Sequence, residues 1–340
     1  MVGDNGQGKT NLLEAVYYVN LLRSVRGARD GDVARFDSSG FFLEASMRVP
    51  DGHTLSVGFE RIGRRKRVRR DDVVIERFSD ALGTLPAVMF APVDVELVSG
   101  APRARRRYLD IMLALSSRGY LHALQNYRAA LERRNAALRA SGRSGSRPSA
   151  IEVWEGPLAD HGAMLVRARR AWVKEVAERF QEYGAAIGER IPMALHYETS
   201  VDANAESVEL AIAEAMAARR DADLRLGVTQ VGPHRDDIRL ALGGRDVRVF
   251  GSAGQQRSAA IVLRTLEVET LRAARGVAPV FLLDDPFAEL DTRRASRVLR
   301  LLKDVGFGQT ILAVPRDADI PPELTMLERR RLEQGRFIPV

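Results

Sequence analysis

A short run near the N-terminus has the residue types of a phosphate-binding loop. Gly3-Asp4-Asn5-Gly6-Gln7-Gly8-Lys9-Thr10 places a glycine at its first and sixth positions, with Lys and Thr at its end. Glycines let backbone N–H groups close around a phosphate, and a following helix adds its positive dipole end. In such loops the lysine reaches the β- and γ-phosphates, and the hydroxyl ligates Mg²⁺. The run predicts a nucleotide site with Thr10 as a metal ligand, formed by Gly3, Asn5, Gly6, Gly8, Lys9, Thr10 and Asn11. The competing interpretation is a glycine-rich turn that only precedes a helix.

Two adjacent carboxylates follow an apolar run near the other end of the chain. Val280–Leu283 reads as a buried strand, and Asp284 and Asp285 come directly after it. Ligand sites in open α/β sheets lie at the carboxyl ends of the strands. We expect Asp284 to hold the Mg²⁺ through water, and Asp285 to act with Lys9 in catalysis by orienting or deprotonating the attacking water. The alternative is that Asp285, before Pro286, only caps a helix.

A second anion-binding arrangement stands between these two motifs. Residues 251–257 read GSAGQQR just before an expected helix, and helix N-termini attract anions. One protomer cannot readily use two such sites on one γ-phosphate. Ser252, Gly254 and Gln255 are therefore predicted to cap the nucleotide of a second protomer, which implies a homodimer.

The elements needed to position these residues alternate between helix and strand patterns. Lys9 and Asp284 lie 275 positions apart, so an α/β head interrupted by a helical insertion is the expected architecture. Asp51-Gly52 reads as the turn of a hairpin within 41–59. The expected helices are 9–19, 103–115, 120–138, 151–187, 254–274 and 292–303. A second strand pair is expected around 67–75. The other expected strands are 85–90, 195–200, 224–231, 237–242, 247–250, 280–283 and 310–314.

Composition excludes several classes of protein and site. The 340 residues contain no cysteine, which excludes disulfides, thiolate zinc sites and a cysteine nucleophile. No apolar run approaches the ~18 residues of a membrane span, and the N-terminus lacks the apolar core of a signal peptide. We expect a cytoplasmic protein without membrane contact. The net charge of +7 is almost all arginine, since lysine occurs only at Lys9, Lys66, Lys174 and Lys303.

Two arginine clusters could contact nucleic acid. Residues 64–70 read RRKRVRR, and contact with DNA phosphates competes there with a simple solvated turn. The second cluster consists of Arg103, Arg105, Arg106 and Arg107, where stabilisation of a helix is the competing interpretation. Arg235 could face the nucleotide or pair with Asp236 or Asp237.

Taken together, the motifs resemble those of the bacterial RecF family, over most of the chain and in the expected order. The matching strings are GDNGQGKTNLLEAVYY (3–18), APVDVELVSGAPRARRRYLD (91–110), LERRNAAL (131–138), VGPHRDD (231–237), GSAGQQR (251–257) and FLLDDPFAELD (281–291). The resemblance implies an ABC/SMC-type ATPase head with a helical arm between its Walker A and Walker B motifs. The implied segments are a head part at 1–100, an arm at 101–195 and a second head part at 196–340. It also implies that Ala288-Glu289-Leu290-Asp291 crosses a dimer interface.

The same resemblance implies a function. A protein of this kind is a weak DNA-dependent ATPase that binds ATP with Mg²⁺, dimerises on ATP and binds single-strand/double-strand DNA junctions without sequence specificity. It works with RecR and RecO to load RecA, and it supports the SOS response. Family members have a strand leading into the phosphate loop, and we expect the chain as written to lack it. The alternatives are another SMC-like ATPase, as in phage defence, or a DNA-binding scaffold that no longer hydrolyses ATP.

Overall fold

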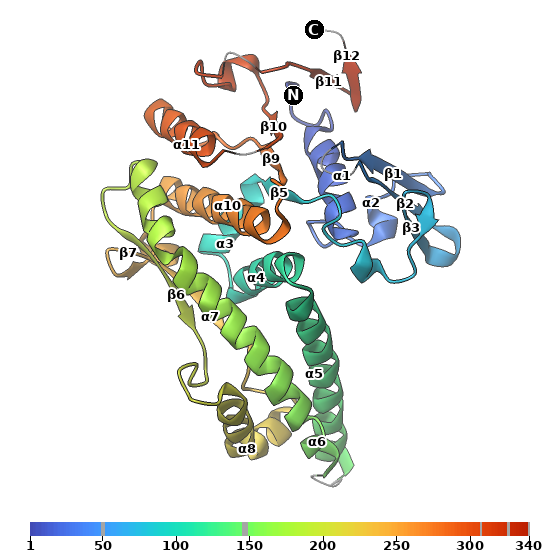
Figure 1. Ribbon diagram of the computed structural model, residues 1–340, viewed down its shortest axis with the longest axis vertical. Coiled ribbons are helices and arrows are strands. Elements are labelled where there is room, and N and C mark those ends of the chain that lie inside the picture. Colours follow the sequence, from blue (N-terminus) through green and yellow to red (C-terminus); the bar gives the residue numbers. More distant parts are fainter. Residues whose placement is uncertain (49–51, 145–148, 307, 325–326, 339–340) are drawn as a thin grey trace. The chain divides into compact units, whose positions relative to one another are not determined.

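The computed structural model groups the chain into two compact units (Figure 1). It describes residues 1–340 except 49–51, 145–148, 307, 325–326 and 339–340. Unit 1 is Met1–Asp94, Ala186–Gly188 and Ala260–Val340, and unit 2 is Val95–Ala185 and Glu189–Ala259. The division differs from the three expected segments, because residues 196–259 group with the helical part of the chain. None of the helices in the described ranges is long and apolar enough to span a membrane.

A parallel sheet forms the centre of unit 1. Its strands are β5 (Ala87–Phe90), β9 (Val280–Asp284) and β10 (Thr310–Ala313), in the order β10-β9-β5. Every residue of β5 is buried, as expected for a strand covered on both faces. The strands expected at 85–90, 280–283 and 310–314 are thereby confirmed. Because β5, β9 and β10 are parallel, their carboxyl ends meet at one edge, where Asp284 lies.

Val2 continues this sheet beyond β10. It bridges in parallel to Val314 on one side and to Arg331 on the other. Arg331 belongs to a hairpin of β11 (Arg331–Glu333) and β12 (Arg336–Ile338). The N–H of Val314 donates to the carbonyl of Met1 (3.0 Å), and the N–H of Leu332 donates to that of Val2 (2.9 Å). Met1 and Val2 thus occupy a strand position directly before the phosphate loop.

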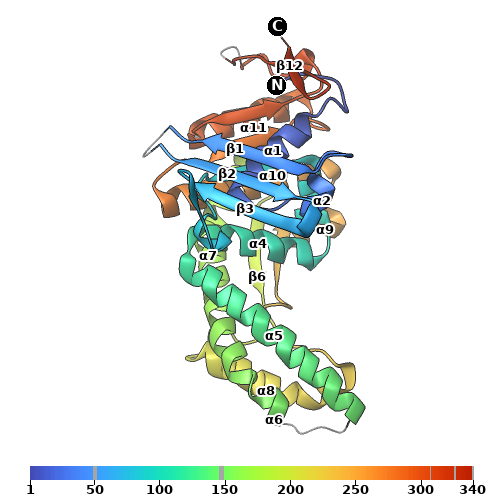
Figure 2. The ribbon, with the colours of Figure 1, turned by 90° about the vertical axis from the view of Figure 1, so that its right-hand side faces the viewer.

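Helix α1 (Lys9–Leu21) contacts both the parallel sheet and an antiparallel one. The antiparallel sheet has the order β1 (Gly40–Ser46), β2 (Thr54–Glu60), β3 (Arg65–Arg70) and β4 (Val73–Val74) (Figure 2). Its inner face packs on α1 through a cluster of apolar side chains: Tyr18, Val19, Leu22, Leu55, Val57, Val68 and Ala81. The expected helix and hairpin are confirmed, although Asp51 of the expected turn lies outside the described residues.

The remaining elements of unit 1 are short apart from one helix. That helix, α11 (Thr292–Val305), begins where the Asp291 carboxylate accepts from the N–H of Arg294 (2.9 Å) and ends at Gly306. The expected helix at 292–303 is confirmed. The short elements are α2 (Asp30–Val33), η1 (Ile62–Arg64), η2 (Phe78–Asp80) and η4 (Asp317–Asp319). Three elements cross between the units along the chain, namely η3 (Pro92–Val95), α7 (Glu155–Ala186) at its last residue, and α10 (Ala253–Arg275).

Unit 2 is mainly helical. Its helices are α3 (Glu96–Ser99), α4 (Pro102–Ser116), α5 (Arg118–Ser144), α6 (Ser149–Glu152), α7 (Glu155–Ala186), α8 (Val208–Leu226) and α9 (Val247–Phe250). A small antiparallel sheet has the order β6 (Met193–Glu198), β7 (Asp237–Leu242) and β8 (Arg245–Asp246). The predicted helical insertion is confirmed, as are the strands at 195–200 and 237–242.

Two expected strands in this unit are wrong. Residues 224–226 end α8, which Ser207 caps at its start and Gly227 at its end, and no strand covers 228–231 among the described residues. Residues 247–250 form the single turn α9, because the Asp246 carboxylate accepts from the N–H of Arg248 (2.8 Å). Strong local caps overrode the apolar pattern in both places.

A buried ion-pair network joins three helices of unit 2. Arg134 of α5 is fully buried and donates to Asp223 of α8 (2.7 Å) and to Glu155 of α7 (2.9 Å). Its guanidinium also donates to the Thr229 hydroxyl (2.8 Å). Because buried charges need such partners, the network holds the middle of α5 next to the start of α7 and the end of α8.

Candidate nucleotide site

The phosphate loop ends in a helix whose first turn has free donors. Helix α1 begins at Lys9 with no side chain capping its N-terminus and no acidic residue in its first turn. The first N–H groups of a helix have no partner within the helix, so they attract an anion. Gly8, the residue before α1, has φ +96°, a conformation that side-chain-bearing residues rarely adopt. The backbone around Gly8 and Lys9 therefore fits a phosphate group.

The side chain of the loop's lysine is held by backbone carbonyls of the same loop. Lys9 is only 7% exposed, and its ammonium donates to the carbonyls of Gly3 and of Asp4, the latter at 2.9 Å. No carboxylate of the described residues forms an ion pair with it. A buried ammonium whose partners are neutral carbonyls is a strong donor toward an incoming phosphate.

Thr10 and Asp284 meet although 274 positions separate them. The Thr10 hydroxyl donates to the Asp284 carboxylate at 2.7 Å, and Asp284 is 6% exposed. Hydroxyl and carboxylate oxygens are the ligands that Mg²⁺ prefers. The structure thus brings together the two side chains that the sequence predicts as metal ligands.

Asp285 has an unusual backbone. Its φ is +46°, in the left-handed region that costs a non-glycine residue about 1–2 kcal/mol. Its N–H donates to the carbonyl of Ala313 (2.8 Å), which fixes this conformation at the end of β9. A cavity of about 410 Å³ lies beside it, also lined by Phe287, Ala288 and Leu290. Strained residues of this kind are typical of functional sites.

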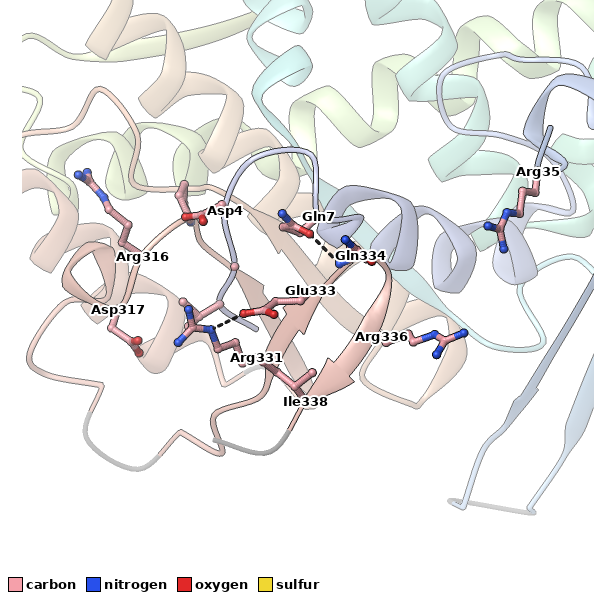
Figure 3. Close-up of a pocket in the computed structure, with 13 residues that line it drawn as sticks. Asp4, Gln7, Arg35, Arg316, Asp317, Arg331, Glu333, Gln334, Arg336 and Ile338 are labelled. Carbon is pink, nitrogen blue, oxygen red and sulfur yellow. Dashed lines mark hydrogen bonds and ion pairs between the residues drawn. The ribbon is translucent and has the colours of Figure 1, made fainter.

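The turn between β11 and β12 supports the phosphate loop, and this contact is absent from the sequence-based predictions (Figure 3). The N–H of Gln334 donates to the Gln7 side-chain carbonyl (2.6 Å), and the N–H of Gly335 donates to the Gln7 backbone carbonyl (2.9 Å). A side chain at Gly8 would come within 3.5 Å of Gly335. The turn has positive φ at both Gln334 and Gly335, so the Gln-Gly pair between two short strands was the available signal.

The predicted signature residues begin α10 and belong to unit 2. The Ser252 hydroxyl accepts from the N–H of Gln255 (3.3 Å), and the Gln255 side chain accepts from the N–H of Ser252 (2.9 Å). This reciprocal pair is a capping box, and Gly254 lies within its turn. Ser252 is exposed, whereas Lys9, Thr10, Asp284 and Asp285 belong to unit 1.

Comparison with known proteins gives a consistent result. The chain is 37% identical over 340 residues to the DNA replication and repair protein RecF of Frankia alni, covering 96% of this chain and 89% of that protein. The protein of the same name from Thermosynechococcus vestitus is 35% identical over 311 residues, covering 89% and 81%. The chain belongs to the RecF family. No family model matches it.

Solved structures agree with membership in the RecF family. A structure of the recombination mediator protein RecF in the RecFOR pathway, described as RecF-ATP, has a TM-score of 0.89 at 26% identity and covers 99% of this chain and 90% of that one. Its RecF-ATPrS counterpart has a TM-score of 0.88 at 27% identity, with the same coverage. An Smc head domain from Pyrococcus furiosus has a TM-score of 0.50 at 17% identity, covering 94% and 83%. The predicted ABC/SMC-type head fold is confirmed.

Residues 231–237, one of the strings that resemble the RecF family, are held by ion pairs in unit 2. Arg105 of the second arginine cluster is buried and donates twice to Asp237 (2.7 and 2.8 Å). Arg106 donates to the carbonyl of Asp236 (2.7 Å). Arg235 donates to the carbonyl of Thr229 instead of to a neighbouring carboxylate. Arg105 and Arg106 therefore have structural partners within the unit.

His234 lies in the same segment and stays neutral. Its Nδ1 faces the Tyr127 hydroxyl (2.6 Å), and its Nε2 faces the carbonyl of Thr229 (3.0 Å). Burial, helped by the positive charges of Arg235, Arg106 and Arg169, lowers the pKa of His234 to about 4. The Asp236 carboxyl beside it has its pKa raised, chiefly by burial.

This depressed pKa predicts acid sensitivity. The unfolded chain binds a proton at this histidine below a pKa of about 6.5, and the folded chain only below about 4. Between these values the unfolded state holds more protons, so the free energy of unfolding falls as pH falls, by about 3 kcal/mol at most. Urea unfolding from pH 7 to 4 should show this loss. The slope should be shallower in His234→Asn, and an unchanged slope would contradict a neutral buried histidine.

Proposed function

We propose that this RecF-family chain is an ATP-gated DNA-binding protein of recombinational repair and replication. The observation that carries the proposal is the hydrogen bond between Thr10 and Asp284, beside a helix N-terminus with free donors. Relatives that share most of its length are named DNA replication and repair protein RecF, and a similar structure is described as RecF-ATP. These names favour repair over the phage-defence alternative.

In the proposed site, the loop and Lys9 bind the phosphates of ATP. The N–H groups around Gly8 and the Lys9 ammonium donate to the β- and γ-phosphate oxygens. Thr10 and Asp284 would hold Mg²⁺, which neutralises charge on the phosphates. Asp285 accepts a proton from the attacking water or orients it, and hydrolysis acts as a slow switch.

Dimerisation completes the proposed site. Ser252, Gly254 and Gln255 stand at the start of α10, where the exposed serine can contact the γ-phosphate held by a partner protomer. Ala288–Asp291 begin three residues after Asp285, so the loop predicted to cross the interface lies close in sequence to the proposed catalytic carboxylate.

The proposed partners follow from the family and its pathway. Closure of the dimer places basic surfaces on gapped DNA without reading its sequence, because phosphate contacts position a protein without specifying bases. The pathway named with the similar structures supports RecR and RecO as partners, with RecA loading and the SOS response as the outcome. The cysteine-free composition supports a cytoplasmic location.

ATP-dependent dimerisation tests this proposal. The unmodified chain should bind ATP and change from monomer to dimer by light scattering when ATP and Mg²⁺ are added. Lys9→Arg should abolish the change, because the longer guanidinium cannot occupy the space of the ammonium in the loop. A chain that binds no ATP would favour the scaffold alternative, and a Lys9→Arg chain that still dimerises on ATP would contradict the proposal.

A further inference from the structure

The outer face of the antiparallel sheet in unit 1 carries an organised set of side chains. The strand register of β1, β2 and β3 places three rows across this face. They are Gly40–Glu60–Arg65, Phe42–Gly58–Arg67 and Glu44–Ser56–Arg69. In Figure 2 these strands face the viewer with α1 behind them. The competing interpretation of residues 64–70 as a solvated turn is wrong, because only Arg64 precedes β3, and the strand pair expected around 67–75 is confirmed by β3 and β4.

The charges of β3 divide between its two faces. Lys66 points inward, where it pairs with Asp30 (3.0 Å) and donates to the carbonyl of Leu22. Arg65, Arg67 and Arg69 alternate with it and are exposed. In the described part of the chain, no carboxylate forms an ion pair with these three guanidiniums. They form a stripe of positive charge whose side chains are not paired with carboxylates of the described residues.

An aromatic ring occupies the middle row. Phe42 is 66% exposed, and its ring lies 3.8 Å from where a side chain at Gly58 would begin. The ring therefore lies beside Gly58 and is mostly open to solvent. Ile62, just beyond the end of β2, is 87% exposed. Neither the Phe42 ring nor the Ile62 side chain is buried in the core, although both are apolar and lie on a charged surface.

The two carboxylates of this face lie in the outer rows. Glu60 is opposite Arg65, and Glu44 is on β1 in the row of Arg69. The middle row holds only Phe42, Gly58 and Arg67, so an anion meets no carboxylate there. An aromatic ring in the same row of a sheet as a guanidinium is an arrangement by which proteins stack bases and hold the adjoining phosphates.

From these features, we infer that the outer face of β1–β3 binds single-stranded DNA. Phe42 stacks on a base, and Arg65, Arg67 and Arg69 contact successive phosphates. This inference rests on the proposed DNA-binding function and adds the surface and the form of the DNA. Duplex DNA keeps its bases inside the helix, where Phe42 cannot stack on them, so the exposed ring favours a single strand.

The experiment compares two variants of equal charge change. In the first, Arg65, Arg67 and Arg69 are replaced by Gln. In the matched control, Arg293, Arg297 and Arg300 on α11 of the same unit, all exposed, are replaced by Gln. The probe is a fluorescent oligodeoxythymidylate, measured by anisotropy over a range of salt, with a duplex of equal length beside it. ATP binding is measured for each protein to show that the nucleotide site is intact.

We expect the β3 variant to lose about 100-fold in affinity for the single strand at 0.1 M salt. Three lost phosphate contacts reduce the slope of log K against log salt by about 2, since each contributes roughly 0.7 on a single strand. Phe42→Ala should lose about 5- to 100-fold with an unchanged salt slope, because stacking is not ionic. The α11 control should bind like the unmodified chain.

Three results would count against the inference in different ways. If the β3 variant binds the single strand like the α11 control, the face is not the DNA surface. If the β3 variant loses duplex affinity equally and Phe42→Ala changes nothing, the face holds duplex phosphates and the single-strand assignment is wrong. If the unmodified chain binds ATP but neither DNA, the proposed DNA function itself fails, and the apolar and basic face serves a protein partner.

Discussion

Asp285→Asn is expected to slow ATP hydrolysis by about 100-fold or more while ATP binding persists. The substitution keeps the size of the side chain but removes the basic oxygen that accepts a proton from water, and general-base catalysis contributes roughly 10²- to 10⁴-fold. The backbone at φ +46° tolerates asparagine at least as well as aspartate. Phosphate release and ATP affinity, measured on the same preparation, separate the two effects.

The control for this variant is Asp304→Asn, an exposed carboxylate on α11. It should hydrolyse ATP at the unmodified rate. Because hydrolysis releases the dimer in the proposed cycle, Asp285→Asn should also stay dimeric longer after ATP addition. If Asp285→Asn hydrolyses ATP at the unmodified rate, Asp285 is not the catalytic base, and the interpretation that it only caps a helix is favoured.

Arg264→Met is expected to lower the free energy of unfolding by about 3–5 kcal/mol, because it leaves buried carboxylates without their positively charged partner. Arg264 of α10 donates to Asp94 at 2.6 Å and to Glu267 at 2.5 Å, and all three side chains are at most 9% exposed. One oxygen of Glu267 already lacks a hydrogen-bond partner, and burial raises the pKa of this carboxyl. Urea unfolding at pH 7 measures the loss.

Arg293→Met provides the matched comparison for this prediction. Arg293 lies on the exposed side of α11, and substitutions at such positions usually change stability by less than about 0.5 kcal/mol. Equal stability of the two variants would mean that the buried ion pairs of Arg264 with Asp94 of η3 and Glu267 of α10 contribute nothing to stability.

Elements with a strong local signal were predictable from sequence. The helix expected at 254–274 is α10 at Ala253–Arg275, because Ser252 and Gln255 cap its start through side chains only three positions apart. The strand before Asp284 was equally predictable, since a short apolar run that ends in two carboxylates is typical of a buried strand of a parallel sheet.

Contacts between distant residues were not predictable in this way. The support that Gln334 and Gly335 give to Gln7 joins positions 327 and 328 residues apart, and no local pattern encodes such a pairing. The same limit applies to Arg105, which the sequence grouped with its arginine neighbours. Only the fold shows that Asp237, 132 positions away, pairs with it and that Lys66 separates from the exposed arginines of β3.

In the proposed dimer, each ATP is shared between Lys9 of one protomer and Ser252 of the other. Mixing two inactive variants tests it most directly. Ser252→Arg, like Lys9→Arg, should abolish ATP-dependent dimerisation when alone, because each homodimer then has two defective sites. A mixed dimer would combine the intact Lys9 of one chain with the intact Ser252 of the other, which gives one complete site.

Light scattering of the two variants, alone and mixed in equal amounts with ATP and Mg²⁺, is therefore the decisive measurement. Each variant alone should stay monomeric, and the mixture should form ATP-dependent dimers. Thermal unfolding of each variant shows that both are folded. A mixture that stays monomeric although both variants are folded, or either variant dimerising alone, would contradict the shared site.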